Sequence, residues 1–373
     1  MSKFSFPFLC LIIAVSVSGG FVNGNESKVE IYELKRGDFS FKATNYGARM
    51  VSLILPDKTG KLVDVVLGFE SVKDYLNDTK NFGALVGRVV NRIKNAEFTL
   101  NGVVYHLDKN SGNNSIHGGK LGYNKVNWTV QEYVKDGPNP FIVFGYNSFD
   151  GEGGFPGNLS VTVTYALLHH YKLSVIMKAK ALNKATPVNL ATHTYWNLGG
   201  QNSGNILSDE VQIFASRYTP ADKNIPTGEI APVKGTPYDF LKPRQVGSRI
   251  HDPALNATSG YDINYALDGY DANKKSKAKK KMSLAVIVKK NKKTGIGMKI
   301  STTAPGMQFY TANFVNNITG KGGYVYQPYC GYAFETQGFP DAVNHPNFPS
   351  TIVNPGEIYT QYMLYEFQVA KKY

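Results

Sequence analysis

The chain has 373 residues and a formal net charge of +13, with 42% hydrophobic and 18% charged residues. This balance excludes an intrinsically disordered chain and is typical of a folded globular protein with a sizeable core. The 37 glycines and the 13% of aromatic residues suit many short strands joined by tight turns.

The N-terminus differs from the rest of the chain. Lys3 precedes an almost wholly apolar run, Phe4–Val17, which has the length of a signal-peptide core and is short for a membrane span. We therefore predict a signal peptide at residues 1–24, one folded domain at residues 28–373, and a protein that enters the secretory pathway and becomes extracellular. The alternative is that this segment is retained as a membrane anchor, since no later segment is long and apolar enough to span.

Short apolar or alternating runs recur along the chain after this segment. They predict strands at residues 29–34, 39–44, 50–55, 63–67, 97–100, 103–107, 141–146, 159–167, 172–179, 211–213 and 284–288. The dipeptide Asn101-Gly102 indicates a tight hairpin between two of them, and Asp57–Lys61 indicates another turn. Helical periodicity is limited to one short turn at Val72–Leu76. The sequence therefore predicts an all-β domain of the sandwich or barrel type.

Polar residues in glycine-rich surroundings are the first candidates for a functional site. Arg92, in Asn91-Arg92, offers a guanidinium fork for a pair of hydroxyls, or else forms a salt bridge. His117 precedes Gly118 and Gly119, where the backbone can approach a ligand closely, or else it is a histidine in a surface turn. Nucleotide, serine-hydrolase and zinc-protease motifs are missing from the sequence.

The other candidates lie among apolar or aromatic residues. His193 is close to Tyr195 and Trp196, whose faces can stack on the C–H surfaces of a sugar; the alternative is a core histidine with its hydrogen bonds satisfied. Asp262 either binds sugar hydroxyls or holds a turn. Glu335 falls in an aromatic strand, where a carboxylate is either paired or raised in pKa and used as a base. Together these residues indicate proton transfer on a small polar substrate.

Metal and nucleic-acid sites are not expected. His169 and His170 are adjacent on a predicted strand, so their rings should point to opposite faces and not share a metal. Lysines are concentrated at residues 274–293 and flank the apolar run Leu284–Val288, without the arginines and aromatic residues of a nucleic-acid site. We expect a strand hairpin with a solvated basic rim, and adhesion to an acidic polysaccharide stays open.

Two further features agree with secretion. Cys330 is the only cysteine after residue 24, which excludes an intramolecular disulfide in the mature chain, and we expect it to be buried. Sequons for N-glycosylation occur at Asn25, Asn77, Asn113, Asn127, Asn158, Asn256 and Asn317.

Ordered motifs then carry a family resemblance. They are N-R-I at 91–93, S-I-H-G-G at 115–119, D-G-E-G-G-F-P-G at 150–157, T-P-V-N-L-A-T-H-T-Y-W-N-L at 186–198, I-P-T-G-E at 225–229, G-Y-D at 260–262 and F-E-T-Q-x-F-P-D-A-V-N-H-P-x-F-P at 334–349. The chain resembles the aldose 1-epimerase (galactose mutarotase) family over about Val29–Val369. The resemblance implies a large twisted antiparallel β-sandwich, the galactose mutarotase-like supersandwich. It also implies interconversion of the α and β anomers of free hexoses such as glucose and galactose.

The resemblance implies roles for single residues. Glu335 falls at the general base, which takes the proton of the anomeric hydroxyl, and His193 falls at the general acid, which protonates the ring oxygen. His117 falls at a second histidine near the ring oxygen. The ligands of the sugar hydroxyls and their supporting residues fall at Asp262, Arg92, Asn91 and Gln308. No cofactor and no metal are implied, and we expect a monomer with a small aldose as its partner.

Three other functions stay open on the sequence alone. A carbohydrate-binding or protein-partner scaffold without catalysis would tolerate the loss of Glu335 or His193, and this chain keeps both. An epimerase for hexose 6-phosphates would need an arginine cluster and a cytosolic address, against which the predicted signal peptide argues. A nucleic-acid binder would have to be built on the lysine-rich segment.

Overall fold

The computed structural model describes residues 28–270 and 281–369. The predicted signal peptide and most of the lysine-rich segment before Leu284 therefore lie outside the described residues. Within the described part almost every regular element is a β-strand, and the single α-helix is the short α1 (Val72–Leu76). No helix among these residues is long and apolar enough to cross a membrane. The prediction of an all-β fold is confirmed.

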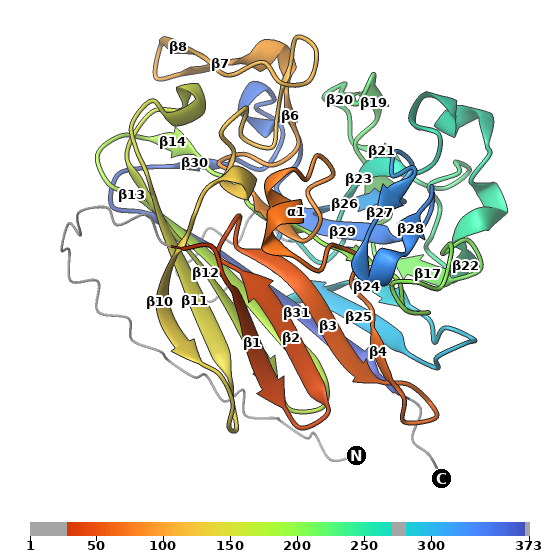
Figure 1. Ribbon diagram of the computed structural model, residues 1–373. Coiled ribbons are helices and arrows are strands. Elements are labelled where there is room, and N and C mark those ends of the chain that lie inside the picture. Colours follow the sequence, from red (N-terminus) through yellow and green to blue (C-terminus); the bar gives the residue numbers. More distant parts are fainter. Residues whose placement is uncertain (1–27, 271–280, 370–373) are drawn as a thin grey trace, which may run out of the picture.

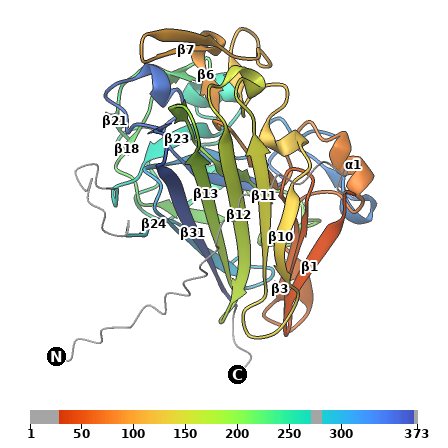
Figure 2. The same cartoon turned by 90° about the vertical axis from the view of Figure 1, so that its left-hand side faces the viewer.

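The largest sheet has nine strands that pair antiparallel. In spatial order they are β10 (Thr129–Val134), β11 (Phe141–Ser148), β12 (Leu159–Leu168), β13 (Lys172–Ala181), β31 (Ile358–Gln368), β25 (Gly297–Thr302), β24 (Ser283–Val288), β17 (Glu210–Ile213) and β22 (Arg244–Gln245). Every second residue of β12 is buried, beginning with Leu159 and Val161. Since side chains of a strand alternate between faces, one face of this sheet lies on the core and the other faces outward. Figure 2 shows its long strands side by side.

A four-stranded sheet covers part of the inner face. It consists of β1 (Ile31–Arg36), β2 (Phe39–Thr44), β3 (Arg49–Pro56) and β4 (Leu62–Asp64). Tyr165 of β12 joins the two sheets, because its ring lies 5.2 Å from that of Phe41 and its hydroxyl donates to the Ala48 carbonyl at 2.8 Å. Figure 1 shows the four-stranded sheet lying across the larger one. These two sheets form the expected sandwich.

A six-stranded sheet lies beside the sandwich, and two of its strands are buried on both faces. Its strands in order are β16 (Tyr195–Trp196), β29 (Tyr332–Gln337), β26 (Gly306–Tyr310), β23 (Asp262–Ala266), β18 (Arg217–Tyr218) and β21 (Ala231–Pro232). On the core side Phe334 and Phe309 are cross-strand partners whose rings stack 5.2 Å apart. Trp196 on the same side lies 5.1 Å from Tyr365 of β31. The opposite face is therefore turned away from the core.

Two-stranded ladders complete the described structure. They are β5 (Ala84–Val86) with β15 (Ala191–His193), β6 (Arg92–Ile93) with β9 (Ser115–Ile116), β7 (Glu97–Leu100) with β8 (Val103–His106), β14 (Thr186–Pro187) with β30 (Ile352–Val353), β19 (Ala221–Asp222) with β20 (Ile225–Pro226), and β27 (Ile318–Thr319) with β28 (Val325–Tyr326). The β7–β8 hairpin turns at Asn101-Gly102 as predicted, with positive φ at both residues. Cys330 is buried, as expected.

Two local predictions are wrong. The strand predicted at residues 63–67 is shorter, because β4 ends at Asp64 and Val66 forms only an isolated bridge to Trp196. His169 and His170 are not on a strand: Leu168 pairs with Lys172, which leaves the histidines in the turn between β12 and β13. Their ring centroids lie 6.1 Å apart. The end of β12 is apolar up to Leu168 and does not indicate at which residue the chain turns back into β13.

Candidate active site

Three polar side chains form a row across the outer face of the six-stranded sheet. Glu335 of β29 is the cross-strand partner of Gln308 of β26, which in turn is the partner of Asn264 of β23. Directly opposed residues of an antiparallel sheet project to the same side, so the three side chains share one face. All three are buried. The structure thus brings together the predicted Glu335 and Gln308 and adds Asn264, which the sequence analysis did not single out.

Asp262 belongs to the same face, two residues before Asn264 on β23. Its Oδ1 accepts a hydrogen bond of 2.7 Å from Nε2 of Gln308. Oε2 of Glu335, Oε1 of Gln308 and Oδ1 of Asn264 have no hydrogen-bond partner among the described residues. Buried acceptors without donors are rare in folded proteins, so this floor suits a ligand that supplies hydroxyl donors.

His193 is the last residue of β15 and faces Glu335. Nε2 of His193 lies 3.7 Å from Oε1 of Glu335, and both side chains are almost fully buried. The carbonyl of His193 accepts a hydrogen bond of 3.0 Å from the Gly83 N–H, just before β5, which fixes this strand end. Because 3.7 Å is longer than a direct hydrogen bond, the two groups face a common gap and do not satisfy each other.

Burial moves the pKa values of this pair in opposite directions. It raises the pKa of Glu335 to about 8, an effect that the charge of Asp262 increases and that of Arg92 opposes. It lowers the pKa of His193 to about 4, and the positive charge of Arg49 contributes to the decrease. At neutral pH Glu335 therefore holds a proton and His193 is neutral. Titratable neighbours with pKa values driven apart are typical of acid–base sites.

His117 forms a second imidazole wall. Its ring centroid lies 5.3 Å from that of His193, at an interplanar angle of 85°. Burial, followed by the charges of His193 and Arg92, lowers the pKa of His117 well below its usual value. Its Nδ1 accepts a hydrogen bond of 3.2 Å from the Asn91 N–H. The neutral ring therefore carries its proton on Nε2 and presents a donor at that atom.

Gly118, which follows His117, allows two stretches of main chain to pack closely. A Cβ on Gly118 would lie 1.9 Å from the carbonyl oxygen of Gly87. Gly118 is required because two stretches of main chain pack closely here. The structure thus gives Gly118 a packing role, and a close approach of the backbone to a ligand stays a prediction. His117 itself lies beside His193.

Arg92 is the first residue of β6, and Asn91 precedes it. Oδ1 of Asn91 accepts a hydrogen bond of 2.8 Å from the Arg92 N–H, which holds the two residues in a fixed relation. Asn91 also lines one pocket together with Asp262, Asn264 and Gln308. Burial raises the pKa of Asp262 as it does that of Glu335, and the charge of Arg92 opposes both increases. All seven residues that the sequence singled out are connected by these contacts and charges.

Tyr195 and Trp196 project to opposite faces of β16. The ring of Tyr195 lies 5.0 Å from that of His193, whereas Trp196 is fully buried on the core side. Trp196 therefore cannot stack on a sugar at this site, because neighbouring residues of a strand point to opposite sides, whereas stacking on Tyr195 stays a prediction. Tyr310, whose ring lies 6.4 Å from that of His193, forms an aromatic wall that the sequence analysis missed.

Asp341 is a buried carboxylate that was also missed, and it binds the backbone next to Arg92. The Asp341 N–H donates to the Arg92 carbonyl at 3.1 Å, and Oδ1 accepts from the Lys94 N–H at 3.1 Å. Nε2 of His345 lies 3.3 Å from Oδ2 of the same carboxylate. Asp341 therefore binds the backbone on both sides of Ile93. Its motif was visible in the sequence, but the contact with a strand so distant in the chain was not.

Within the described residues, no group of three or more His, Cys, Asp or Glu side chains is placed to hold a metal ion. The side chains around the gap between His193 and Glu335 are a carboxyl, imidazoles, amides, a guanidinium and tyrosines. Such a set can bind hydroxyl groups and move protons.

Comparisons with known proteins agree with this chemistry. Residues 30–366 match the sequence profile of the aldose 1-epimerase family. The chain is 42% identical over 344 residues to the galactose mutarotase of Mus musculus, covering 92% of this chain and 95% of that one. It is 32% identical over 327 residues to the aldose 1-epimerase of Escherichia coli, covering 87% and 90%. The crystal structure of an aldose epimerase homologue from C. elegans aligns with a TM-score of 0.81 at 25% identity, covering 92% of this chain and 100% of that one.

The support of Arg92 by Asp341 can be measured with a double-mutant cycle. D341A removes the Oδ1 bond to the Lys94 N–H and keeps the main-chain bond to Arg92. We expect it to lower kcat/KM for a free aldose about tenfold, mainly through KM, because the backbone that carries Arg92 is then held less firmly. In an R92A background the same change should cost less than about twofold, since it acts through Arg92. Equal losses in both backgrounds, with unchanged melting temperature, would show that Asp341 acts elsewhere.

Proposed function

The chain belongs to the aldose 1-epimerase family and is a mutarotase, and we propose that Glu335 and His193 perform its proton transfers on free hexoses such as glucose and galactose. The observation that carries this proposal is the buried pair itself, with its atoms 3.7 Å apart and not hydrogen-bonded to each other. The two reacting oxygens of a cyclic sugar are bonded to one carbon, so a base and an acid that share one gap are suitably placed to serve both.

The reaction follows from this placement. The Glu335 carboxylate takes the proton of the anomeric hydroxyl while His193 gives a proton to the ring oxygen. The bond between C1 and the ring oxygen breaks, and a C1 carbonyl forms. Rotation about the C1–C2 bond presents the other face of the aldehyde. Closure then reverses both transfers: His193 takes back the proton of the attacking hydroxyl, and Glu335 returns one to the former carbonyl oxygen.

The number of protons on the pair decides when it can react. Between the pKa of about 4 for His193 and about 8 for Glu335, the pair holds one titratable proton. The reactive arrangement, a carboxylate beside an imidazolium, contains the same number of protons and needs only a transfer within the site. Sugar hydroxyls that donate to Glu335 favour the carboxylate in the bound state.

The other site residues hold the sugar. Asp262 accepts hydrogen bonds from sugar hydroxyls, Arg92 donates hydrogen bonds to hydroxyl oxygens, and Nε2 of His117 donates near the ring oxygen. Gln308 orients Asp262 through its 2.7 Å hydrogen bond, and Asn91 fixes both Arg92 and His117. No cofactor is part of this scheme. Since mutarotation already proceeds in water, one base and one acid, each worth roughly 10²–10⁴-fold, suffice.

We also propose that the protein is a secreted, glycosylated monomer whose first 24 residues are a cleaved signal peptide and whose enzymatic domain starts near residue 28. The apolar run Phe4–Val17 supports the leader. Exposure at sequons supports glycosylation, because oligosaccharide transfer needs an accessible asparagine. The exposed ones are Asn77, Asn113, Asn127, Asn256 and Asn317.

Removal of the base is the direct test of the mechanism. E335Q should reduce the decay of optical rotation of fresh α-D-glucose or α-D-galactose to the spontaneous rate, a loss of at least about 10²-fold. The substitution should not unfold the chain. The wild-type carboxyl favours folding while it is neutral, and this contribution is lost as the pH rises through about 8, whereas glutamine keeps it. E335Q that still catalyses at the wild-type rate would overturn the assignment.

The pH dependence tests the shared proton. After subtraction of the spontaneous rate, kcat/KM should be level between about pH 4 and about pH 8 and fall outside this range. Above it the pair loses its only proton, and below it both members are protonated. A rate that instead rises with pH through 8 would mean that deprotonation of Glu335 alone is limiting.

Mass spectrometry of protein secreted by a eukaryotic host tests the leader and the glycans. We expect a mature N-terminus near residue 25 and a mass that decreases on treatment with an N-glycan hydrolase. Recovery of full-length chain in the membrane fraction would instead support the retained anchor.

A further inference from the structure

A cluster of lysines lies on two surface turns of the sandwich, and none of it takes part in the active site. We call it the lysine clasp and define it as Lys58, Lys61, Lys289, Lys290, Lys292 and Lys293. All six are exposed. The first two belong to the turn between β3 and β4, and the other four belong to the loop that joins β24 to β25. The described part of the basic segment thus forms the expected hairpin with a solvated basic rim.

Hydrogen bonds lock the two turns of the clasp together. The Lys58 N–H donates to the Thr294 carbonyl at 2.7 Å, and Nζ of Lys58 donates to the Lys292 carbonyl at 2.8 Å. Oγ1 of Thr294 donates to the Leu198 carbonyl at 2.6 Å, and Nδ2 of Asn291 donates to Oδ1 of the buried Asp209 at 2.7 Å. The lysines therefore stand on a fixed backbone, which lowers the ordering entropy that a partner has to overcome.

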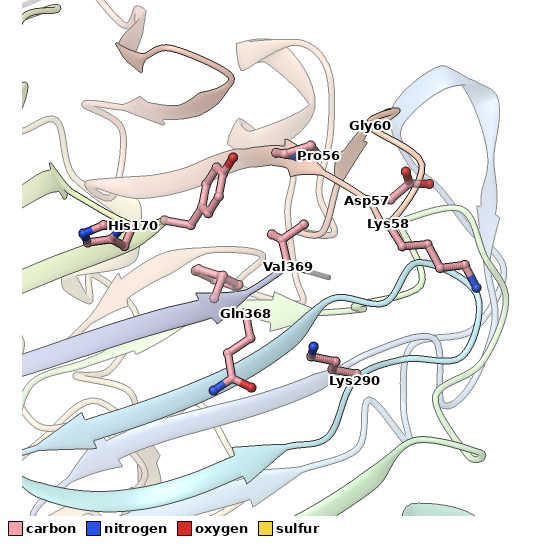
Figure 3. Close-up of a pocket in the computed structure, with 10 residues that line it drawn as sticks. Pro56, Asp57, Lys58, Gly60, His170, Lys290, Gln368 and Val369 are labelled. Carbon is pink, nitrogen blue, oxygen red and sulfur yellow. The ribbon is translucent and has the colours of Figure 1, made fainter. Parts of the chain in front are cut away.

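Two of the hollows that border the clasp contain five of its six lysines. One, of about 720 Å³, is lined by Lys58 and Lys290, with His170 also at its edge. Figure 3 shows these residues around it, together with Gln368 of β31. The other, of about 260 Å³, is lined by Lys289, Lys290, Lys292 and Lys293. Concave surface between fixed positive charges suits an extended anionic chain better than a flat basic face does.

Few carboxylates oppose these charges. Of the described residues that line the two hollows, the acidic ones are Asp57, Asp209 and Glu210. Oδ1 of Asp57 accepts hydrogen bonds within its own turn, from the N–H groups of Thr59 and Lys61. Asp209 is buried, and its pKa is raised by that burial. The clasp therefore keeps an excess of accessible positive charge.

We propose that the lysine clasp binds an acidic polysaccharide, through carboxylate or sulfate groups repeated along the chain. A nucleic acid fits less well. No arginine occurs among the described residues that line the hollows. The aromatic rings there, Tyr171 and Phe367, pack against Phe39 at 5.7 and 6.3 Å and are not free to stack on bases. Binding at this surface is independent of the mutarotase reaction, and an encounter with such a polysaccharide outside the cell rests on the proposed secretion.

The experiment must separate the clasp from the positive charge of the whole protein. The test variant is K289Q/K290Q/K292Q/K293Q, and the control is K178Q/K180Q/K234Q/K242Q, which removes the same charge from exposed lysines elsewhere. Binding to polygalacturonate, dextran sulfate, uncharged dextran and duplex DNA is measured by calorimetry over a range of salt concentrations. Mutarotation and melting temperature are measured for all three proteins.

We expect the wild type and the control to bind at least one acidic polysaccharide and to ignore dextran. The clasp variant should bind about tenfold more weakly or worse, with a smaller dependence on salt because fewer counterions are released. Activity should be unchanged in both variants. Comparison of polygalacturonate with dextran sulfate identifies the preferred anionic group. Equal losses in the two variants, no binding by the wild type, or DNA binding as tight as that of the polysaccharides at equal salt would each overturn the proposal.

Discussion

The active site depends on one constraint: a carboxyl group is buried on a strand whose residues are buried on both faces. Alternation along β29 directs Phe334 into the core and Glu335 to the opposite side. The stacked rings of Phe334 and Phe309 fix the strand from the core side. The position of Glu335 is therefore set by the same packing that stabilises the sheet, and burial without a hydrogen-bonded cation gives the raised pKa that a base at neutral pH needs.

The nearby arginines favour the charged form of the carboxyl groups and disfavour the charged form of the histidines. Burial raises the pKa of Glu335 and of Asp262, and the charge of Arg92 opposes this increase at both carboxyls. The same charge disfavours protonation of His117, and Arg49 has this effect on His193. Arg49 is itself neutralised by Asp78 in a buried ion pair at 2.5 Å. Burial, with a smaller contribution from these cations, thus keeps both histidines neutral in the free enzyme and leaves a carboxyl as the group that binds the proton.

Local patterns in the sequence were sufficient to predict many of the strands and to single out several candidate site residues. The Asn101-Gly102 turn and the alternation of β12 follow from near-neighbour chemistry, and an acid in an aromatic strand is unusual enough to single out Glu335. What the sequence could not provide is pairing between distant segments. The side of the sheet taken by Trp196, the row that adds Asn264 to Glu335 and the support of Arg92 by Asp341 all depend on contacts between strands far apart in the chain.

The active site and the lysine clasp handle charge in opposite ways. At the site, ionisable groups are buried, so their interactions are strong and little affected by dissolved ions. At the clasp, the ammonium groups stay hydrated and differ from an ordinary basic surface mainly in the rigidity of the two turns that carry them. Asp209 lies between these regions, since it accepts hydrogen bonds from Asn291 of the clasp loop and from Tyr332 of β29. Tyr332 projects to the core side of the strand, opposite to Glu335. The shared β29 therefore anchors both surfaces without placing the clasp charges near the reacting pair.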